Sequence, residues 1–213
     1  MSHFITLVLV PKDSLDVEGT VSALLAPYDE EITVAPYATD CYCIGGIARR
    51  AGVQAADREV EDLDDLRTRY WDLPKEGRST WEAWTADWIA VADRTEKAHP
   101  LYQKPNPKCE DCQGRGKRVT TYNPQSQWDW WVIGGRWDGW LSRTNQLKAK
   151  TAAQKGKVPF AIVTPDGVWH DKGKMGWWGM VADEKADADW GHEVRQLLMA
   201  HPDATAVACD LHI

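Results

Sequence analysis

The spacing of apolar and polar residues in the first part of the chain predicts a strand, a helix and a second strand. Residues 4–10 form an almost continuous apolar run rich in Ile, Val and Thr, as in a buried strand. Asp13 or Ser14 can cap a helix that extends to about Pro27 with its apolar residues on one face. Residues 31–34 then have the composition of a short strand.

The last part of the chain repeats this order. Residues 159–163 and 168–170 predict the two arms of a hairpin around a Thr-Pro-Asp-Gly turn. Residues 183–201 carry apolar side chains at helical spacing, and residues 204–212 form an apolar strand. Two strand–helix–strand halves indicate an α+β fold, and we expect a ferredoxin-like sandwich of an antiparallel sheet with helices.

The length of the chain and these two halves predict its domain organisation. We expect a single domain over residues 1–213, with core halves at about 1–50 and 158–213. The two halves flank a long middle at about 51–157, which contains helical segments, a cysteine knuckle and a Trp-rich segment. We therefore expect this middle to be a large insertion in the sandwich.

The insertion itself contains three segments with helical features. Residues 57–69 are strongly charged and acidic, which indicates an exposed helix. Residues 79–97 predict a second helix, capped by Ser79, with a stripe of tryptophans along one side. Residues 145–157 are rich in Lys, Ala and Gln and are typical of a mobile linker or an exposed helix.

Charge and composition exclude several kinds of partner. The formal charge is −7 and the sequence pI is near 5.4, whereas a generic nucleic-acid binder carries a basic field. No apolar run approaches the roughly 18 residues that a membrane span requires, and no signal peptide is evident. We therefore expect a cytoplasmic protein that binds neither generic nucleic acid nor a membrane, and we leave open a homo-oligomer.

The cysteines predict a metal site. Cys109 and Cys112 form a C-x-x-C knuckle followed by glycines, and Cys41 and Cys43, also followed by glycines, can supply the second half of a four-cysteine structural zinc site. An odd number of cysteines and a reducing compartment argue against a disulfide framework. Two alternatives remain: Cys41 and Cys43 serve only as packing, or the C-x-x-C is redox-active. Cys209 is most simply a core residue.

Thirteen tryptophans occur in the chain, and five of them lie within residues 128–140. Indoles beside a Gly-Gly-Arg turn favour a surface that holds a flat, negatively charged ligand. In a strand, Trp128 and Trp130 would share one face and Trp131 the other. We expect a nucleotide-like ligand, with its base stacked on the rings and its phosphate on Arg136. The candidate ligand-binding residues are Asn123, Trp128, Asp129, Trp130, Trp131, Arg136, Trp137, Trp177 and Trp178.

A structural interpretation of the same tryptophans stays open. Aromatic segments can clamp an insertion onto a sheet, with Asp129 accepting a hydrogen bond from an indole and Arg136 in a structural ion pair. The second cluster, with Trp177 and Trp178 among glycines, favours a loop around a ligand. A loop rich in Met and Trp can equally cap the core.

The segment at residues 122–137, YNPQSQWDWWVIGGRW, resembles the signature of an uncharacterised protein family found in bacteriophages and actinobacteria. The knuckle at 109–116, the cluster at 169–180 and the closing Asp-x-His-Ile at 210–213 are similar to that family as well. The family has no settled activity to transfer. A phage setting implies, by analogy, a protein that captures nucleotide-derived immune signals of the host as a counter-defence sponge.

A catalytic alternative rests on His170, Asp171, Asp210 and His212, which would meet if the hairpin arm and the last strand are neighbours in the sheet. Two His and two Asp can hold a metal or perform acid–base chemistry, as in a metal-dependent nucleotide hydrolase or nuclease. The sequence contains no P-loop, G-x-S-x-G or H-E-x-x-H motif. We therefore favour a non-enzymatic binder of an ADP-ribose or cyclic-nucleotide type of ligand. A third hypothesis is a protein-interaction module that inhibits a host enzyme through its indoles.

Overall fold

The structure, a computed structural model, describes residues 2–176 and 180–213. The chain forms two compact units, Met1–Val34 with Tyr122–Ile213, here the sheet unit, and Ala35–Thr121, here the cysteine unit. The cysteine unit begins and ends earlier than the insertion expected at 51–157, so that the Trp-rich segment belongs to the sheet unit. Among the helices of the described residues, none combines the length and apolar character needed to cross a bilayer.

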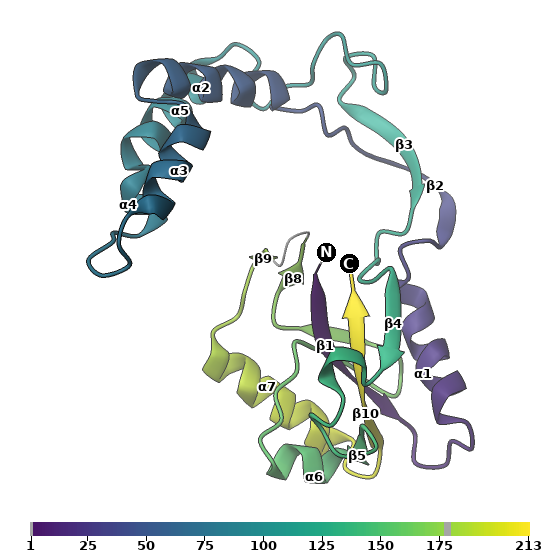
Figure 1. Cartoon of the computed structure of the whole chain (residues 1–213). Helices are drawn as coiled ribbons and strands as arrows, with labels where there is room; N and C mark the ends of the chain where they lie inside the picture. The colour runs from purple at the N-terminus through teal and green to yellow at the C-terminus, as the bar shows by residue number, and fades with distance from the viewer. Residues whose placement is uncertain (1, 177–179) are drawn as a thin grey trace. The chain divides into compact units, whose positions relative to one another are not determined.

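The sheet unit is built on one mixed sheet with the strand order β4-β10-β1-β6-β7, and β5 also pairs with β10 (Figure 1). Its strands are β1 (His3–Val10), β4 (Trp130–Ile133), β5 (Gln146–Lys148), β6 (Ala161–Val163), β7 (Trp169–Asp171) and β10 (Thr205–His212). Strand β1 is antiparallel to β10 and parallel to β6. Because β1 has a neighbour on each side and a core on each face, its apolar run is buried from Phe4 to Val10.

Helices cover both faces of this sheet. Helix α1 (Val17–Leu25) packs on the face that contains Val8, whereas α6 (Ala149–Gln154) and α7 (Asp187–Ala200) pack on the face that contains Leu7. Successive residues of a strand point to opposite faces, which separates these two cores. The α+β class is therefore confirmed. The ferredoxin-like sandwich is not, because that fold places its helices on one face of the sheet.

Short elements complete the sheet unit. They are the 3-10 turns η1 (Ala26–Tyr28) and η2 (Gly135–Trp137) and the two-stranded sheet of β8 (Lys174–Met175) and β9 (Val181–Ala182). The helix expected from residue 183 begins only at Asp187. Asp183 has a left-handed φ of 53°, which an α-helix does not accept. The segment at 145–157, expected as a linker or a helix, forms β5 and then α6.

The cysteine unit contains a helical layer and the cysteine loops. Its helices are α2 (Gly46–Glu59), α3 (Leu63–Asp72), α4 (Trp81–Trp84) and α5 (Ala86–Ala98). Strands β2 (Thr33–Asp40) and β3 (Lys117–Tyr122) pair with each other where the chain leaves and rejoins the sheet unit. A small apolar core of Ala56, Leu66 and Trp88 joins three of these helices.

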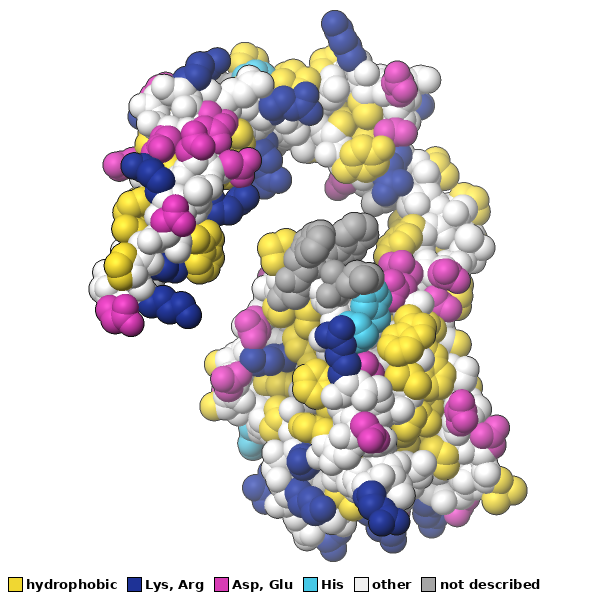
Figure 2. All heavy atoms as spheres, in the orientation of Figure 1, with side chains coloured by type: hydrophobic (Ala, Val, Ile, Leu, Met, Phe, Trp, Pro, Cys, Tyr) yellow, Lys and Arg dark blue, Asp and Glu magenta, His cyan; other side chains and the backbone are white. Residues whose placement is uncertain are grey.

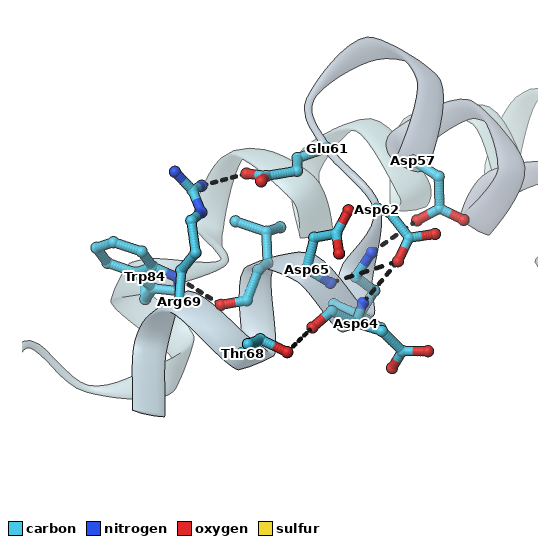
Figure 3. A network of polar contacts seen from close by, with 10 residues as sticks. Asp57, Glu61, Asp62, Asp64, Asp65, Thr68, Arg69 and Trp84 are labelled. Carbon is cyan, nitrogen blue, oxygen red and sulfur yellow. Dashed lines mark hydrogen bonds and ion pairs between the residues drawn. The ribbon is translucent and has the colours of Figure 1, made fainter. Parts of the chain in front are cut away.

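The acidic segment at 57–69, expected as one helix, is split between the end of α2 and the start of α3. The Asp62 carboxylate caps α3 by accepting hydrogen bonds from the backbone N–H groups of Asp64, at 2.9 Å, and Asp65, at 3.4 Å (Figure 3). Asp57 accepts a hydrogen bond from the backbone N–H of Leu63 and so ties the two helices together. A strong capping residue in mid-segment therefore divides the helix.

The helix expected over residues 79–97 also begins and continues differently. The cap is Thr80, whose hydroxyl accepts a hydrogen bond from the N–H of Ala83, and it replaces the expected Ser79. Helix α4 ends at Thr85, where φ is −101° and ψ is 9°, and α5 then begins. The tryptophan stripe is confirmed in part, since Trp88 is buried and its indole N–H donates to Asp57.

Candidate metal centre and histidine–aspartate site

The four cysteines of the cysteine unit come together as a cluster. All of their Sγ atoms lie within 4.8 Å of one another, with 3.7 Å between those of Cys41 and Cys109 and 3.5 Å between those of Cys43 and Cys112. Zn–S bonds of about 2.3 Å in a tetrahedron place the sulfurs about 3.8 Å apart. A disulfide would bring two of them to about 2 Å. The spacing and the donor set therefore fit one tetrahedral metal ion.

The glycines of the knuckle allow the two cysteine loops to meet. Gly114 and Gly116 have left-handed φ values of 78° and 74°. A Cβ at either position would lie 3.3 Å from Pro107 or Pro105, so that a side chain would crowd the loop. The backbone N–H of Cys41 donates to the carbonyl of Gly116 at 2.9 Å and fastens the first cysteine pair to the second.

Electrostatics distinguish the thiols of this cluster. Burial raises the pKa of the Cys43 thiol to about 12. Burial also opposes ionisation of Cys112, but the backbone N–H of Gly116 and the neighbouring thiols lower its pKa to about 7. The thiolate is the form of cysteine that binds metal ions. Cys209 lies apart in the sheet core, as expected from the sequence.

The Trp-rich segment divides between the core and the surface. Trp128 is only 7% exposed, and its indole N–H donates to the carbonyl of Leu25 at 3.1 Å. Trp131 packs against the same core. Trp130 is 48% exposed. The expectation that Trp128 and Trp130 share a face is therefore wrong, because Trp128 precedes β4 and turns into the core beside α1.

The other predicted ligand-binding residues lie in different surroundings. Asn123 is buried, and its amide donates to the carbonyls of Pro27 and Asp29, so that it holds the chain and is not open to a ligand. Arg136 is exposed, and its guanidinium forms no ion pair with any carboxylate of the described residues. Trp137 is half-buried, and its buried indole N–H has no hydrogen-bond partner among the described residues.

The Gly-Gly-Arg turn approaches a carboxylate of its own chain. Gly135 has a φ of 55°, and a Cβ there would lie 2.5 Å from Oδ2 of Asp210 and 2.8 Å from Cγ1 of Val132. Only glycine leaves room for this contact. The backbone N–H of Arg136 then donates to the same Oδ2 at 2.9 Å. The turn therefore lies against the carboxylate of Asp210.

Two histidines of neighbouring strands are each held by an aspartate. Nδ1 of His3 lies 2.9 Å from Oδ1 of Asp210, and Nδ1 of His212 lies 2.5 Å from Oδ1 of Asp129. The two imidazole centroids are 4.9 Å apart. His3, His212 and Trp130 are register partners across β1, β10 and β4, which places their side chains in one row on one face of the sheet.

Burial and proton placement give this histidine–aspartate site its chemical character. The Asp210 side chain is 2% exposed, and both of its oxygens accept hydrogen bonds, as a buried carboxylate requires. An ionised carboxylate only accepts hydrogen bonds, so Nδ1 is the donor in each pair and Nε2 is the ring nitrogen left for another partner. Nε2 of His212 is buried and has no partner among the described residues.

Two of the four residues in the catalytic grouping expected from the sequence do not lie at this site. Strand β7 is separated from β10 by β6 and β1, so that His170 and Asp171 do not join Asp210 and His212. His170 lies 3.8 Å from Glu193, and Asp171 accepts the indole N–H of Trp169. Instead, His3 pairs with Asp210, and Asp129 pairs with His212. Neither His3 nor Asp129 belonged to the expected grouping.

Two further candidates, Trp177 and Trp178, lie outside the described residues. No family model, curated protein or solved structure matches the chain.

Proposed function

We propose that the sheet unit binds a small nucleotide-like ligand at the histidine–aspartate site. The observation that carries this proposal is the pair of aspartate-held imidazoles beside the half-exposed indole of Trp130. The Trp130 and His3 rings meet edge to face with centroids 6.1 Å apart. One face of the sheet thus offers stacking and hydrogen bonding side by side. Figure 2 shows histidine and hydrophobic side chains together at the end of the sheet unit where β1 begins and β10 ends.

The chemistry of these groups suits a base and a phosphate. An exposed indole stacks on a nucleobase, a contact worth about 1–3 kcal/mol. The guanidinium of Arg136, exposed and without an ion pair in the described chain, can pair with phosphate oxygens. We leave three of the expected residues out of the proposed set, because Trp128 and Asn123 are buried and the partly buried Trp131 packs against the core.

The family resemblance adds a physiological role to this proposal. A bacteriophage protein that held an ADP-ribose or cyclic-nucleotide signal would lower the free concentration of that signal in the host. Binding alone is sufficient for such a sponge, and tight, stoichiometric capture is what the role requires.

Titration calorimetry and tryptophan fluorescence with ADP-ribose and cyclic nucleotides test the binding proposal. We expect saturable binding by the native protein, its loss in Trp130→Ala, and its retention in Trp71→Ala. Trp71 is a matched control, because it is 64% exposed and lies in the cysteine unit. If none of these nucleotides binds and a protein co-purifies with the chain, the result contradicts the proposal and favours a protein-interaction module.

A second function, structural zinc binding, is favoured by the cysteine cluster. Four thiols at tetrahedral spacing, in a unit whose helices share only a small apolar core, are typical of a metal site that stabilises its unit. After dialysis against a mild chelator, metal analysis should give one zinc ion per chain. Cys112→Ser should fall well below that ratio, whereas the control Cys209→Ser should keep it. An equal zinc content in both variants would contradict the assignment.

A further inference from the structure

We infer that the histidine–aspartate site also cleaves ribonucleotide phosphodiesters, with His3 and His212 as an acid–base pair and the substrate's own 2′-hydroxyl as the nucleophile. This inference rests on the proposed function, because the substrate must first bind beside Trp130. It assigns a reaction to a site for which the sequence suggested metal-dependent hydrolysis by a different set of residues. The juxtaposition of two aspartate-held imidazoles carries it.

Each aspartate holds its histidine in one orientation. Asp129 forms two hydrogen bonds with His212. Its backbone N–H donates to the His212 carbonyl at 2.9 Å, and its carboxylate accepts from Nδ1 of the ring. Two hydrogen bonds hold the Asp210 carboxylate, one from the backbone N–H of Arg136 and one with Nδ1 of His3. A carboxylate on Nδ1 sets the tautomer of the ring and leaves Nε2 to exchange protons with a substrate.

The pair offers a base and an acid at one place. Imidazole is the side chain that most often serves as a general acid or a general base in enzymes. Among residues 2–176 and 180–213, no group forms a hydrogen bond with the buried Nε2 of His212, and a substrate hydroxyl can supply that bond.

The remaining groups of the site point to a nucleophile that the ligand brings. Both carboxylates are engaged by the imidazoles, and the Ser2 hydroxyl donates to the carbonyl of Gly176 at 3.2 Å. A ribose carries its own hydroxyl next to the phosphodiester. Attack within the substrate needs only proton transfer and charge neutralisation, which imidazoles and the guanidinium of Arg136 can perform.

The reaction balances without a further reagent. Nε2 of the neutral histidine takes the proton of the 2′-hydroxyl, and O2′ forms a bond to phosphorus. The bond from phosphorus to O5′ breaks, and the protonated histidine gives its proton to O5′. The products are a 2′,3′-cyclic phosphate and a free 5′-hydroxyl. The two histidines have then exchanged protonation states, which proton exchange with water reverses.

Chromatography of the ribodinucleotide ApA and its 2′-deoxy analogue dApA, incubated with the full chain, tests this inference. We expect ApA to yield adenosine and a cyclic phosphate, and dApA to bind without cleavage. His3→Gln and His212→Gln should each lower kcat by about 100-fold to 10,000-fold while calorimetry still detects dApA. The control His192→Gln, at an exposed position of α7, should keep the full rate.

Each other outcome has a definite meaning. Bound ApA that stays intact overturns the cleavage and leaves ligand binding standing. Cleavage of dApA, or an equal rate in His212→Gln, overturns the 2′-hydroxyl step or the assigned pair. Absence of binding by ApA, dApA and the nucleotide panel overturns the binding function together with the reaction. Asp129→Asn, a positioning change, should distort the pH profile of kcat and not merely scale it.

Discussion

Gly135 is the position where a single methyl group should disturb the histidine–aspartate site most directly. In Gly135→Ala the new Cβ would lie 2.5 Å from Oδ2 of Asp210, 2.6 Å from its Cβ and 2.8 Å from Cγ1 of Val132. The residue also has a φ of 55°, which an L-residue with a side chain adopts at a cost. The substitution therefore both strains the backbone and displaces the carboxylate that holds His3.

The expected loss of stability has two parts. A left-handed backbone costs a residue with a side chain about 1–2 kcal/mol. Overpacking against Asp210 and Val132 adds about 1–3 kcal/mol, because neither neighbour is the far end of a long flexible chain. The total of about 2–5 kcal/mol is a large share of the roughly 5–15 kcal/mol that stabilises an ordinary domain.

Urea unfolding of Gly135→Ala and Gly139→Ala separates these parts. Gly139 has a φ of 74° and no heavy atom within 4 Å of its would-be Cβ, so that its alanine variant carries the backbone cost alone. We expect Gly135→Ala to be less stable than this control by about 1–3 kcal/mol. Equal stability of the two variants would refute the claim that the turn packs against the Asp210 carboxylate.

Two other predictions concern the core of the sheet unit. Burial raises the pKa of Cys209 to about 12, so its thiol is neutral at pH 8 and should escape iodoacetamide until the protein unfolds, as peptide mass spectrometry would show; alkylation in the folded protein would contradict this. Trp190 is fully buried, and its indole N–H donates to the carbonyl of Pro159 at 2.7 Å. Trp190→Phe should cost about 2–4 kcal/mol in urea unfolding, and a cost below about 0.5 kcal/mol would count against this packing.

The elements that the sequence predicted well are those with a strong apolar signal. The runs at 4–10 and 204–212 became β1 and β10, because a strand covered on both faces needs apolar residues at nearly every position. Helix α2 was not predicted. Its buried residues are small, with Ala48, Ala55 and Ala56 on the inner face, and such a stripe has little apolar contrast.

The two sites differ in how far local spacing could reveal them. Each half of the cysteine cluster is a short motif, and its donor atoms are close because the motif is short. Asp210 and His212 are likewise two positions apart in one strand, and such residues share a face. His3 and Asp129 reach the site only through pairing of β1, β10 and β4, and strand order depends on long-range packing that no local pattern encodes.

The pairing of β1 has a consequence for how the protein is made in a cell. His3 and Asp210 are 207 positions apart, and translation at 5–20 residues per second takes about 10–40 s to cover that distance. For most of this time the apolar strand β1 has neither of its neighbours, because β6 and β10 are synthesised late. The nascent chain is thus a natural client for chaperones that shield unpaired strands, while the helices of the cysteine unit fold on contacts made early.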